Sequence, residues 1–357
     1  MIGNDFDYVP TLAIRPSEMN GLQHLPGLAK QYMRPVFLVA PWTTANSLEK
    51  GVERAEKAYP EYRYYLDLDR DYSLTNPELD AQGQLLELFS SSDGYGKWWQ
   101  FVEKFERAVP CLQLRDQTRE DLAKQVDRAQ ELGRGFCIRV VLARFPENIS
   151  DVVHILNRIG TADYIVVLEG GWTEDALSFA GTMSGLIGGV FGDVGAQVPI
   201  VVSCTSMPKE FHNFRGCEIL SFTNRELVAQ IARDYNRRRI VYGDWGSTRP
   251  REAPSHKQRP FDRIDYPTKE EWVIARNREE GWGFTESANA VVYRSGRWDA
   301  ELRSWGSNMI LQTLKNPKFG INTPQKNVAS RVNIHLHRQA FYHEDMKNMD
   351  FDDPWED

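Results

Sequence analysis

Eight short runs rich in β-branched and aromatic residues alternate with helical patterns over about the first 245 residues of this 357-residue chain. Strands joined by helix-length connections are typically parallel, because parallel neighbours need a crossover of about a dozen residues or more. Eight repeats of the unit favour a closed (β/α)8 TIM-like barrel of the α/β class. The predicted strands are residues 8–15, 34–42, 62–69, 109–115, 135–143, 162–169, 198–204 and 239–245.

An open, doubly wound sheet is the alternative, and it needs a glycine-rich first turn that residues 15–18 (Arg-Pro-Ser-Glu) do not supply. The patterns between the strands predict helices that cover the outside of the barrel. The predicted helices are residues 16–32, 47–58, 97–107, 118–132, 149–159 and 224–235, with a glycine-rich helix that begins at Thr173.

The rest of the chain divides into two parts. Residues 248–260 are rich in proline, arginine and serine, which indicates a loop, and residues 261–343 contain four tryptophans, which indicates a packed segment. Residues 344–357 hold seven acids and one lysine, which predicts a disordered acidic tail. We therefore predict a barrel at 1–247, a C-terminal extension at 248–343 that caps the barrel mouth, and a tail at 344–357.

Composition narrows the class of protein. A hydrophobic content of 41% is enough for a full core, and a net charge of −7 argues against a basic nucleic-acid coat. We expect no membrane span and no signal peptide, because long apolar runs and a basic, apolar N-terminus are both absent from the sequence. The four cysteines form no Cys-x-x-Cys pair, so we predict reduced thiols and a cytoplasmic protein.

Polar residues recur at alternate positions in six consecutive predicted strands, mostly near the C-terminal ends. Because successive side chains in a strand point to opposite faces, the apolar set is predicted to face the helices and the polar set to face inward. Barrel enzymes keep their active sites at the C-terminal ends of the strands. The predicted inward residues are Asp67, Asp69, Gln113, Arg115, Arg139, Glu169, Ser203, Tyr242 and Asp244.

Charged groups inside a barrel must pair, meet water or bind a ligand, because an isolated buried charge is costly. Arginines in such a ring can hold phosphate or carboxylate oxygens in a bidentate manner. We therefore predict a site for an anionic ligand, with Asp67, Glu169 and Asp244 as catalytic acids or bases. A structural network of ion pairs without activity is the alternative.

The same carboxylates admit two further interpretations. Glu169 with Asp67 or Asp244 could serve a two-carboxylate glycosidase scheme. Two or more of Asp67, Asp69, Glu169 and Asp244 could hold Mg²⁺ through oxygen ligands. No histidine falls near a predicted strand end, so a Ser-His-Asp triad that uses Ser203 is not favoured.

Three other features are less specific. The glycines between Gly185 and Gly195 lack the Gly-Lys-Ser/Thr ending of a phosphate loop, and close helix packing explains them better. Residues 225–278 carry 13 Lys/Arg against 8 Asp/Glu, which could contact phosphates or simply form a solvated face. Phe351 and Trp355 in the acidic tail could dock a protein partner, whereas the alternative is a solubilising tail.

The chain opens with Tyr8-Val-Pro-Thr-Leu12, and Pro35-Val-Phe-Leu-Val39 follows. These two runs resemble the first two strands of the beta protein family of phages and bacterial mobile elements. Further matches are Tyr242-Gly-Asp-Trp245, Arg263-Ile-Asp-Tyr266, Trp272-Val-Ile-Ala-Arg276, Ser304-Trp-Gly-Ser-Asn308 and Asn333-Ile-His-Leu-His337.

The resemblance spans roughly residues 8–340 and implies that 261–343 belongs to one unit with the barrel. It adds residues that line or cap the mouth, namely Asp244, Tyr266, Trp272, Arg276, Ser304 and His335. The chain departs from the family pattern at Ala40-Pro41, at Ser307 and at Leu336, where the family carries an acid, an acid and a second adjacent histidine.

Taken together, these features predict a phage- or mobile-element-associated protein with a polar Asp/Glu/Arg site at the barrel mouth. The site would bind or hydrolyse a phosphate-bearing small molecule or a nucleic-acid end, as a hydrolase of the phosphodiesterase type. The alternative is a non-catalytic interaction protein, or an accessory protein of antiviral defence, that acts through its surface and acidic tail.

Overall fold

The computed structural model of the chain describes residues 6–43, 45–76, 78, 80–159, 163–252, 262–278 and 281–344. The predicted acidic tail therefore lies, apart from Glu344, outside the described residues. The strands are β1 (Tyr8–Ala13), β2 (Val36–Val39), β3 (Tyr64–Leu68), β4 (Ala108–Pro110), β5 (Phe136–Val141), β6 (Tyr164–Trp172), β7 (Ile200–Thr205), β8 (Gly216–Ser221), β9 (Ile240–Asp244), β10 (Ile264–Pro267) and β11 (Glu271–Arg276).

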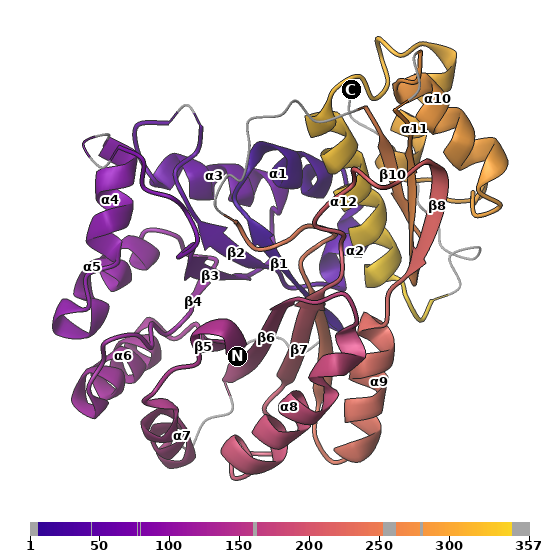
Figure 1. Cartoon of the computed structure of the whole chain (residues 1–357). Helices are drawn as coiled ribbons and strands as arrows, with labels where there is room; N and C mark the ends of the chain where they lie inside the picture. Colours follow the sequence, from indigo (N-terminus) through magenta and orange to yellow (C-terminus); the bar gives the residue numbers. More distant parts are fainter. Residues whose placement is uncertain are drawn as a thin grey trace.

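Helices separate most of these strands (Figure 1). They are α1 (Pro16–Gln23), α2 (Gly27–Gln31), α3 (Glu49–Ala58), α4 (Asp80–Leu88), α5 (Ser92–Glu103), α6 (Arg119–Leu132), α7 (Ile149–Arg158), α8 (Ala180–Gly185), α9 (Asn224–Asp234), α10 (Phe284–Asn289), α11 (Trp305–Lys315) and α12 (Pro324–Ala340). Short 3₁₀ or π turns lie at Leu142–Arg144, Ala176–Phe179, Leu186–Val190 and Ala290–Arg294.

All eight predicted strands are confirmed, and they form one parallel sheet in the order β4-β3-β2-β1-β9-β7-β6-β5. The two outer strands approach each other at a parallel bridge between Cys111 and Cys137. There the Leu112 amide donates to the Cys137 carbonyl at 2.9 Å. The sheet thus nearly closes on itself, with helices around it, as a (β/α)8 barrel.

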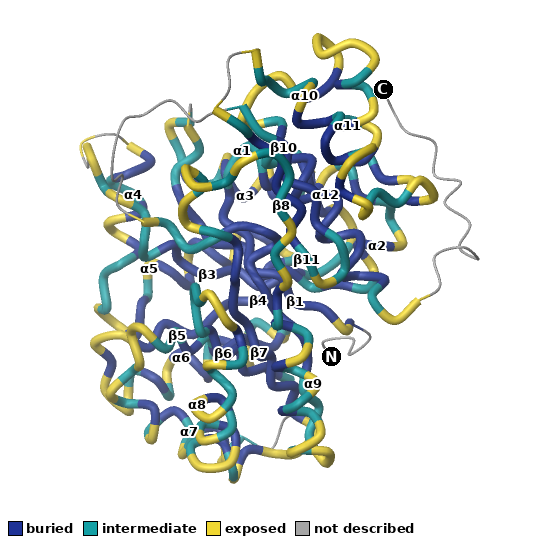
Figure 2. The backbone as a smooth tube through the Cα atoms, turned by 45° about the vertical axis from the view of Figure 1, so that its right-hand side comes forward, coloured by how far each residue is buried: buried dark blue, intermediate teal, exposed yellow. Residues whose placement is uncertain are grey.

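Two apolar layers follow from the alternation along the strands. The inner layer is a small cluster inside the barrel, whereas the outer layer joins the other faces of the strands to the surrounding helices. Figure 2 shows the strands as a buried centre within more exposed helices. The inner cluster is Phe6, Val9, Val36, Leu38, Tyr65, Val109, Cys111, Cys137, Ile165, Val167, Val201, Val241 and Trp245.

Helix α12 completes the ring of barrel helices, although it comes last in the sequence. It lies between α1 and α9 and packs on α1, α2 and β1 (Figure 1). Gly21 of α1 makes this packing possible, since a Cβ there would lie 2.6 Å from the Ala329 carbonyl oxygen. Arg225 of α9 donates to Gln339 of α12 at 2.8 and 2.9 Å. The position is that of the eighth helix of the barrel.

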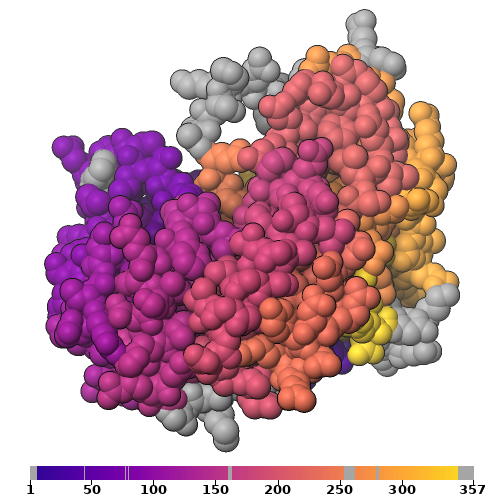
Figure 3. Space-filling view, turned by 60° about the horizontal axis from the view of Figure 1, so that its bottom comes forward, coloured from indigo at the N-terminus to yellow at the C-terminus, as the bar shows by residue number. Residues whose placement is uncertain are grey.

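A smaller unit is inserted between β9 and α12. It contains an antiparallel sheet in the order β10-β11-β8, with α10 and α11 against it. Strand β8 comes from the connection after β7 and was not predicted. Figure 3 shows the salmon-coloured region around β8 against the orange C-terminal unit. The unit has its own apolar cluster, which includes Tyr266, Val273, Val291, Ile310 and Ile334.

The predicted helices at 47–58, 118–132, 149–159 and 224–235 are confirmed within two residues, with Thr118 as the N-cap of α6. The helix predicted at 16–32 is instead two helices, α1 and α2, which Pro26 separates. In the glycine-rich segment, a Cβ at Gly188 would lie 2.6 Å from the Tyr235 hydroxyl. This contact agrees with close helix packing at that glycine.

The segment 245–251, here called the mouth-crossing segment, runs from the end of β9 across the C-terminal end of the barrel. The Thr205 hydroxyl of β7 donates to the Thr248 carbonyl at 2.8 Å. At its far end, Arg251 donates to Asp69, just after β3, at 2.5 Å. Gly246 and Ser247 both have positive φ, 53° and 68°. The C-terminal extension thus begins by crossing the mouth.

We predict that Gly246→Ala destabilises the protein by about 2–4 kcal/mol in urea denaturation. A Cβ at Gly246 would lie 2.4 Å from Leu12 Cδ2, and the left-handed backbone adds strain of about 1–2 kcal/mol. Gly133→Ala is the matched control, because Gly133 has φ 64° and open space around its Cβ position. Equal losses in the two variants would show that the contact with Leu12 contributes nothing.

Candidate functional site

Five of the predicted polar residues lie inside the barrel near its C-terminal end. Asp67 follows the inward Tyr65 on β3, and Arg139 follows the inward Cys137 on β5. Glu169 and Ser203 continue the inward faces of β6 and β7 in the same way. Gln113 lies just after β4. The predicted inward direction of these side chains agrees with the structure.

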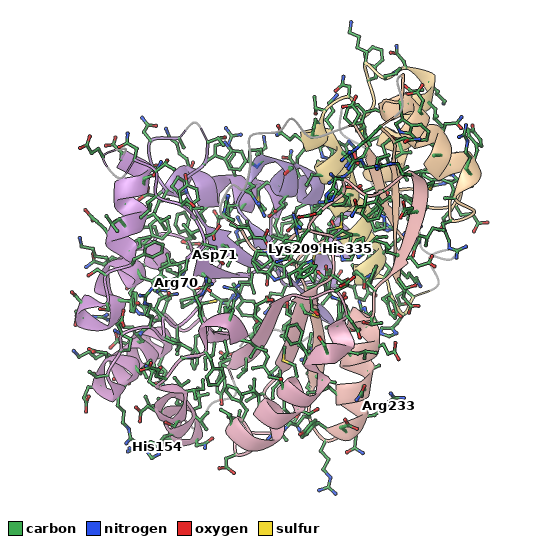
Figure 4. All side chains as sticks on the ribbon, in the orientation of Figure 1. Arg70, Asp71, His154, Lys209, Arg233 and His335 are labelled. Atoms are coloured by element: carbon green, nitrogen blue, oxygen red, sulfur yellow. The ribbon has the colours of Figure 1, made fainter. Side chains whose placement is uncertain are left out.

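Asp67 accepts hydrogen bonds from three directions. Arg139 Nη1 donates to its Oδ2 at 3.1 Å, and Gln113 Nε2 donates to its Oδ1 at 2.7 Å. The Leu68 amide donates to the same Oδ1 at 2.8 Å. Arg70, labelled in Figure 4, then donates to Gln113 Oε1 at 2.7 Å, which connects this network to the mouth. Asp67 and Arg139 form a buried ion pair, with side chains 12% and 5% exposed.

Glu169 is fully buried and is held by three donors. Trp245 Nε1 and the Gly171 amide each donate to its Oε1 at 2.8 Å, and Ser203 donates to its Oε2 at 3.1 Å. Burial raises the pKa of Glu169, and the nearby Arg139 and the three hydrogen bonds only partly offset this. Burial also lowers the pKa of Arg139, but Asp67 and Glu169 together raise it above its usual value. Glu169 is therefore an acid that holds its proton unusually well.

A second layer of charges lies at the mouth itself. Asp69 pairs with Arg251 at 2.5 Å, and Glu18 at the start of α1 pairs with Arg15 at 2.6 Å. Glu18 is 1% exposed, and burial raises its pKa against the lowering effect of Arg15 and Arg251. Sequence reasoning missed Glu18 and Arg251, because neither lies in a strand.

Arg115 was predicted to point into the barrel, and that prediction is wrong. Its side chain is 71% exposed and pairs with Asp116 at 3.3 Å. Strand β4 ends at Pro110, so the alternation of a regular strand no longer applies five residues later. Asp116, next to it, has a left-handed φ of 53°, which turns the chain away.

Tyr242 and Asp244 were also predicted inward, and they lie on the outer face of β9. Tyr242 belongs to the outer apolar layer and stacks on Tyr8 at a centroid distance of 5.5 Å, whereas Val241 and Trp245 face inward. The prediction placed Val241 against an apolar helix. Helix α9 packs on this face and places Arg225 over the Tyr242 ring at 3.6 Å, and α12 presents His335 to Asp244.

His335 of α12, labelled in Figure 4, and Asp244 form the centre of this outer site. His335 Nε2 donates to Asp244 Oδ2 at 2.6 Å, and the hydroxyls of Tyr8 and Tyr242 donate to Asp244 at 2.6 and 2.8 Å. Burial raises the pKa of Asp244, but His335 and the hydrogen bonds hold it below its usual value. His335 also stacks on Trp272 at 5.1 Å. His335 thus joins the C-terminal unit to the outside of the barrel rather than to its mouth.

Arg276 lies on β11 in the C-terminal sheet, outside the barrel. Its side chain is nearly buried, and Nη1 donates to the Phe211 carbonyl. Burial and the neighbouring Arg263 lower its pKa. Ser304, another residue of the family motifs, caps α11 by accepting from the Ser307 amide at 3.1 Å.

Of the four carboxylates considered for Mg²⁺, Asp244 lies on the other face of β9 from the barrel interior. Within the described residues, no group of three or more His, Cys, Asp or Glu side chains is placed to hold a metal ion. Over the same part of the chain, no helix is long and apolar enough to cross a membrane.

Comparison with known proteins gives a family for this arrangement. A family model described as "Beta protein" matches residues 8–341. The chain belongs to the Beta protein family. It is also 24% identical over 352 residues to "Protein beta" of Enterobacteria phage P4, a match that covers 94% of this chain and 93% of the relative. The predicted family is confirmed, with a phage protein among the relatives of this Beta protein.

We expect Asp244→Asn to destabilise this Beta protein by about 3–5 kcal/mol in chemical denaturation. The amide that replaces the carboxylate cannot accept hydrogen bonds from His335 and from both tyrosine hydroxyls. Asp116→Asn removes the carboxylate of the exposed pair with Arg115 and serves as the control. Its effect on the free energy of unfolding should be too small to measure. Similar effects in the two variants would contradict a special role for the buried pair.

The raised pKa of Glu169 gives a pH-dependent prediction. Because the folded chain holds this proton more tightly than the unfolded chain does, the contribution of Glu169 to stability is present below the unfolded pKa near 4.5 and is lost as the pH rises through the folded pKa. Glu169→Gln removes this loss. The free energy of unfolding of the variant, relative to that of the parent, should therefore increase from pH 4 to pH 8. A difference that stays constant across this range would overturn the assignment.

Proposed function

We propose that this Beta protein binds a phosphate-bearing small molecule or a nucleic-acid end at the barrel mouth and hydrolyses a phosphate ester there. The observation that carries the proposal is the buried Glu169, an acid with a raised pKa, beside the guanidinium of Arg139 inside the C-terminal end of a (β/α)8 barrel. A titratable group with a shifted pKa and a specific charge partner is a candidate functional residue, and barrel enzymes keep their sites at this end of the strands.

Unpartnered buried atoms support a ligand in this region. Arg139 Nε, Thr11 Oγ1 on β1 and Ser247 Oγ on the mouth-crossing segment are buried and have no hydrogen-bond partner among the described residues. Buried polar groups normally find partners, so atoms of this kind call for water or a bound group. Arg139 Nε is a donor suited to a phosphate oxygen. Ser247 is also held in a left-handed conformation, a form of strain that clusters at functional sites.

The chemistry assigns a role to each residue. Arg139, held in place by Asp67, would bind the phosphate oxygens and offset charge in the transition state. A water oxygen bonds to phosphorus as the ester bond breaks. Glu169 gives its proton to the leaving oxygen and is restored by the proton that the water loses. Gln113 and Ser203 would keep Asp67 and Glu169 in position, and Asp69 with Arg251 would close the mouth.

The test combines ligand binding with activity. A thermal-shift screen with nucleotides and sugar phosphates, followed by a phosphodiesterase assay on the compounds that bind, should give a substrate. Glu169→Gln should then lower kcat about 100-fold or more with little change in KM, since general acid catalysis contributes about 10²–10⁴-fold. Arg115→Gln is the matched control, because that arginine is exposed and away from the interior.

An unchanged kcat in Glu169→Gln would contradict the catalytic role. If no compound binds and function in the host is lost only when residues 344–357 are deleted, the protein acts instead through its surface and tail, as an interaction or antiviral-defence protein. That segment lies outside the described residues except for Glu344, so its sequence alone supports this second outcome.

A further inference from the structure

A group of arginines surrounds a single buried carboxylate beside the barrel mouth. Arg263 Nε donates to Asp265 Oδ1 at 2.9 Å, and Arg331 Nη1 of α12 donates to Asp265 Oδ2 at 2.5 Å. Arg276 of β11 is next to Arg263, because Arg263 lies 3.5 Å over the Phe211 ring and Arg276 bonds to the Phe211 carbonyl. Arg249, just past β9, completes the arginine cluster, which consists of Arg249, Arg263, Arg276 and Arg331.

The guanidinium groups of this cluster outnumber the carboxylates beside them. Arg263 and Arg331 bond to Asp265, which is 2% exposed. The carboxylate near Arg249 is Glu252, which pairs with Lys209 at 2.9 Å. Burial lowers the pKa of Arg249, Arg276 and Arg331, and Arg263 lowers each of them further. All four arginines remain charged at physiological pH. The lowered pKa values of Arg249, Arg276 and Arg331 therefore reflect desolvation and the mutual repulsion of the guanidinium groups.

Two of the arginines keep donor atoms that no protein group uses. Arg249 Nη1 and Arg331 Nε are buried and have no hydrogen-bond partner in the described part of the chain. Arg249 makes no hydrogen bond or ion pair with any described residue, although Glu252 is an electrostatic neighbour. The ion pairs with Asp265 explain a structural role for Arg331 and Arg263. They do not explain why Arg249 lies beside them.

We propose that the arginine cluster binds a terminal phosphate group. Guanidinium groups match the oxygens of phosphate in a bidentate manner, and a dianionic oxyanion would offset the surplus charge. The Arg331 and Asp265 side chains are 6% and 2% exposed, whereas the Arg263 side chain is 19% exposed. This difference in exposure favours a compact terminal phosphate, which can reach inward. It disfavours a phosphodiester backbone, which would lie along a surface. The site is separate from Glu169 and Arg139 and does not depend on hydrolysis there.

The experiment uses the full chain and isothermal titration with inorganic phosphate and pyrophosphate. Arg249→Gln should weaken binding about tenfold or more, the value of one lost charge-assisted contact. Without added anion the variant should be at least as stable as the parent, because a repulsive charge is removed. Arg233→Gln is the matched control, since Arg233 is exposed on α9 and points away from the molecule (Figure 4).

Two further arms identify the ligand source and separate this proposal from the first one. An oligonucleotide with a 5′-phosphate should compete with pyrophosphate, whereas the same oligonucleotide without it should not. Arg139→Gln, which removes the phosphate contact of the first site, should leave the effect of Arg249→Gln on pyrophosphate binding unchanged. Equal binding by Arg249→Gln and the parent, or loss of stability in Arg249→Gln without anion, would overturn the site. Competition by both oligonucleotides alike would show backbone recognition instead of a terminal phosphate.

Discussion

The burial of a polar helix is the constraint on which the rest of this structure depends. Helix α12 is enclosed between the barrel and the C-terminal sheet, and its buried residues include Arg331, Asn333, His335 and Arg338. Each needs a partner, because an unpaired polar group in such a place costs free energy. Asp265 receives Arg331, Asp244 receives His335, and Asn333 bridges the Gly21 carbonyl and the Gly306 amide at 3.0 and 2.9 Å. The barrel and the inserted unit are therefore held in register by directional bonds as well as by apolar contact.

The alternation of side chains made the barrel and most of its interior predictable. It located all eight barrel strands and correctly turned Asp67, Arg139, Glu169 and Ser203 inward, because a strand in a closed parallel barrel has one face for the helices and one for the interior. The prediction failed where that premise fails. Outside β9, Arg225 of α9 meets Tyr242 and His335 of α12 meets Asp244, so the polar residues of β9 face outward.

The remaining errors come from contacts between distant parts of the chain. Strand β8 gains its partner from β11, whose residues lie some fifty positions later. The local sequence of α12 does not predict that it is the eighth barrel helix, since about eighty residues separate it from β9. Glu18 meets the site from the start of α1, and Arg251 meets it from the mouth-crossing segment. Local patterns carry no information about such long-range pairing, although they do identify the elements themselves.

Because α12 comes late in the sequence, it also affects the order in which the parts of this protein can fold during synthesis. Strands β1 and β9 lie side by side in the barrel wall, and α12, which packs on β1 and bonds to Asp244 of β9, ends at Ala340. During synthesis, a ribosome that has completed every strand of the barrel has still not made this helix. Until it is made, the Asp244 carboxylate lacks its partner His335. The inserted unit is therefore synthesised before the last helix of the barrel, so the barrel is fully covered only after that unit has been made.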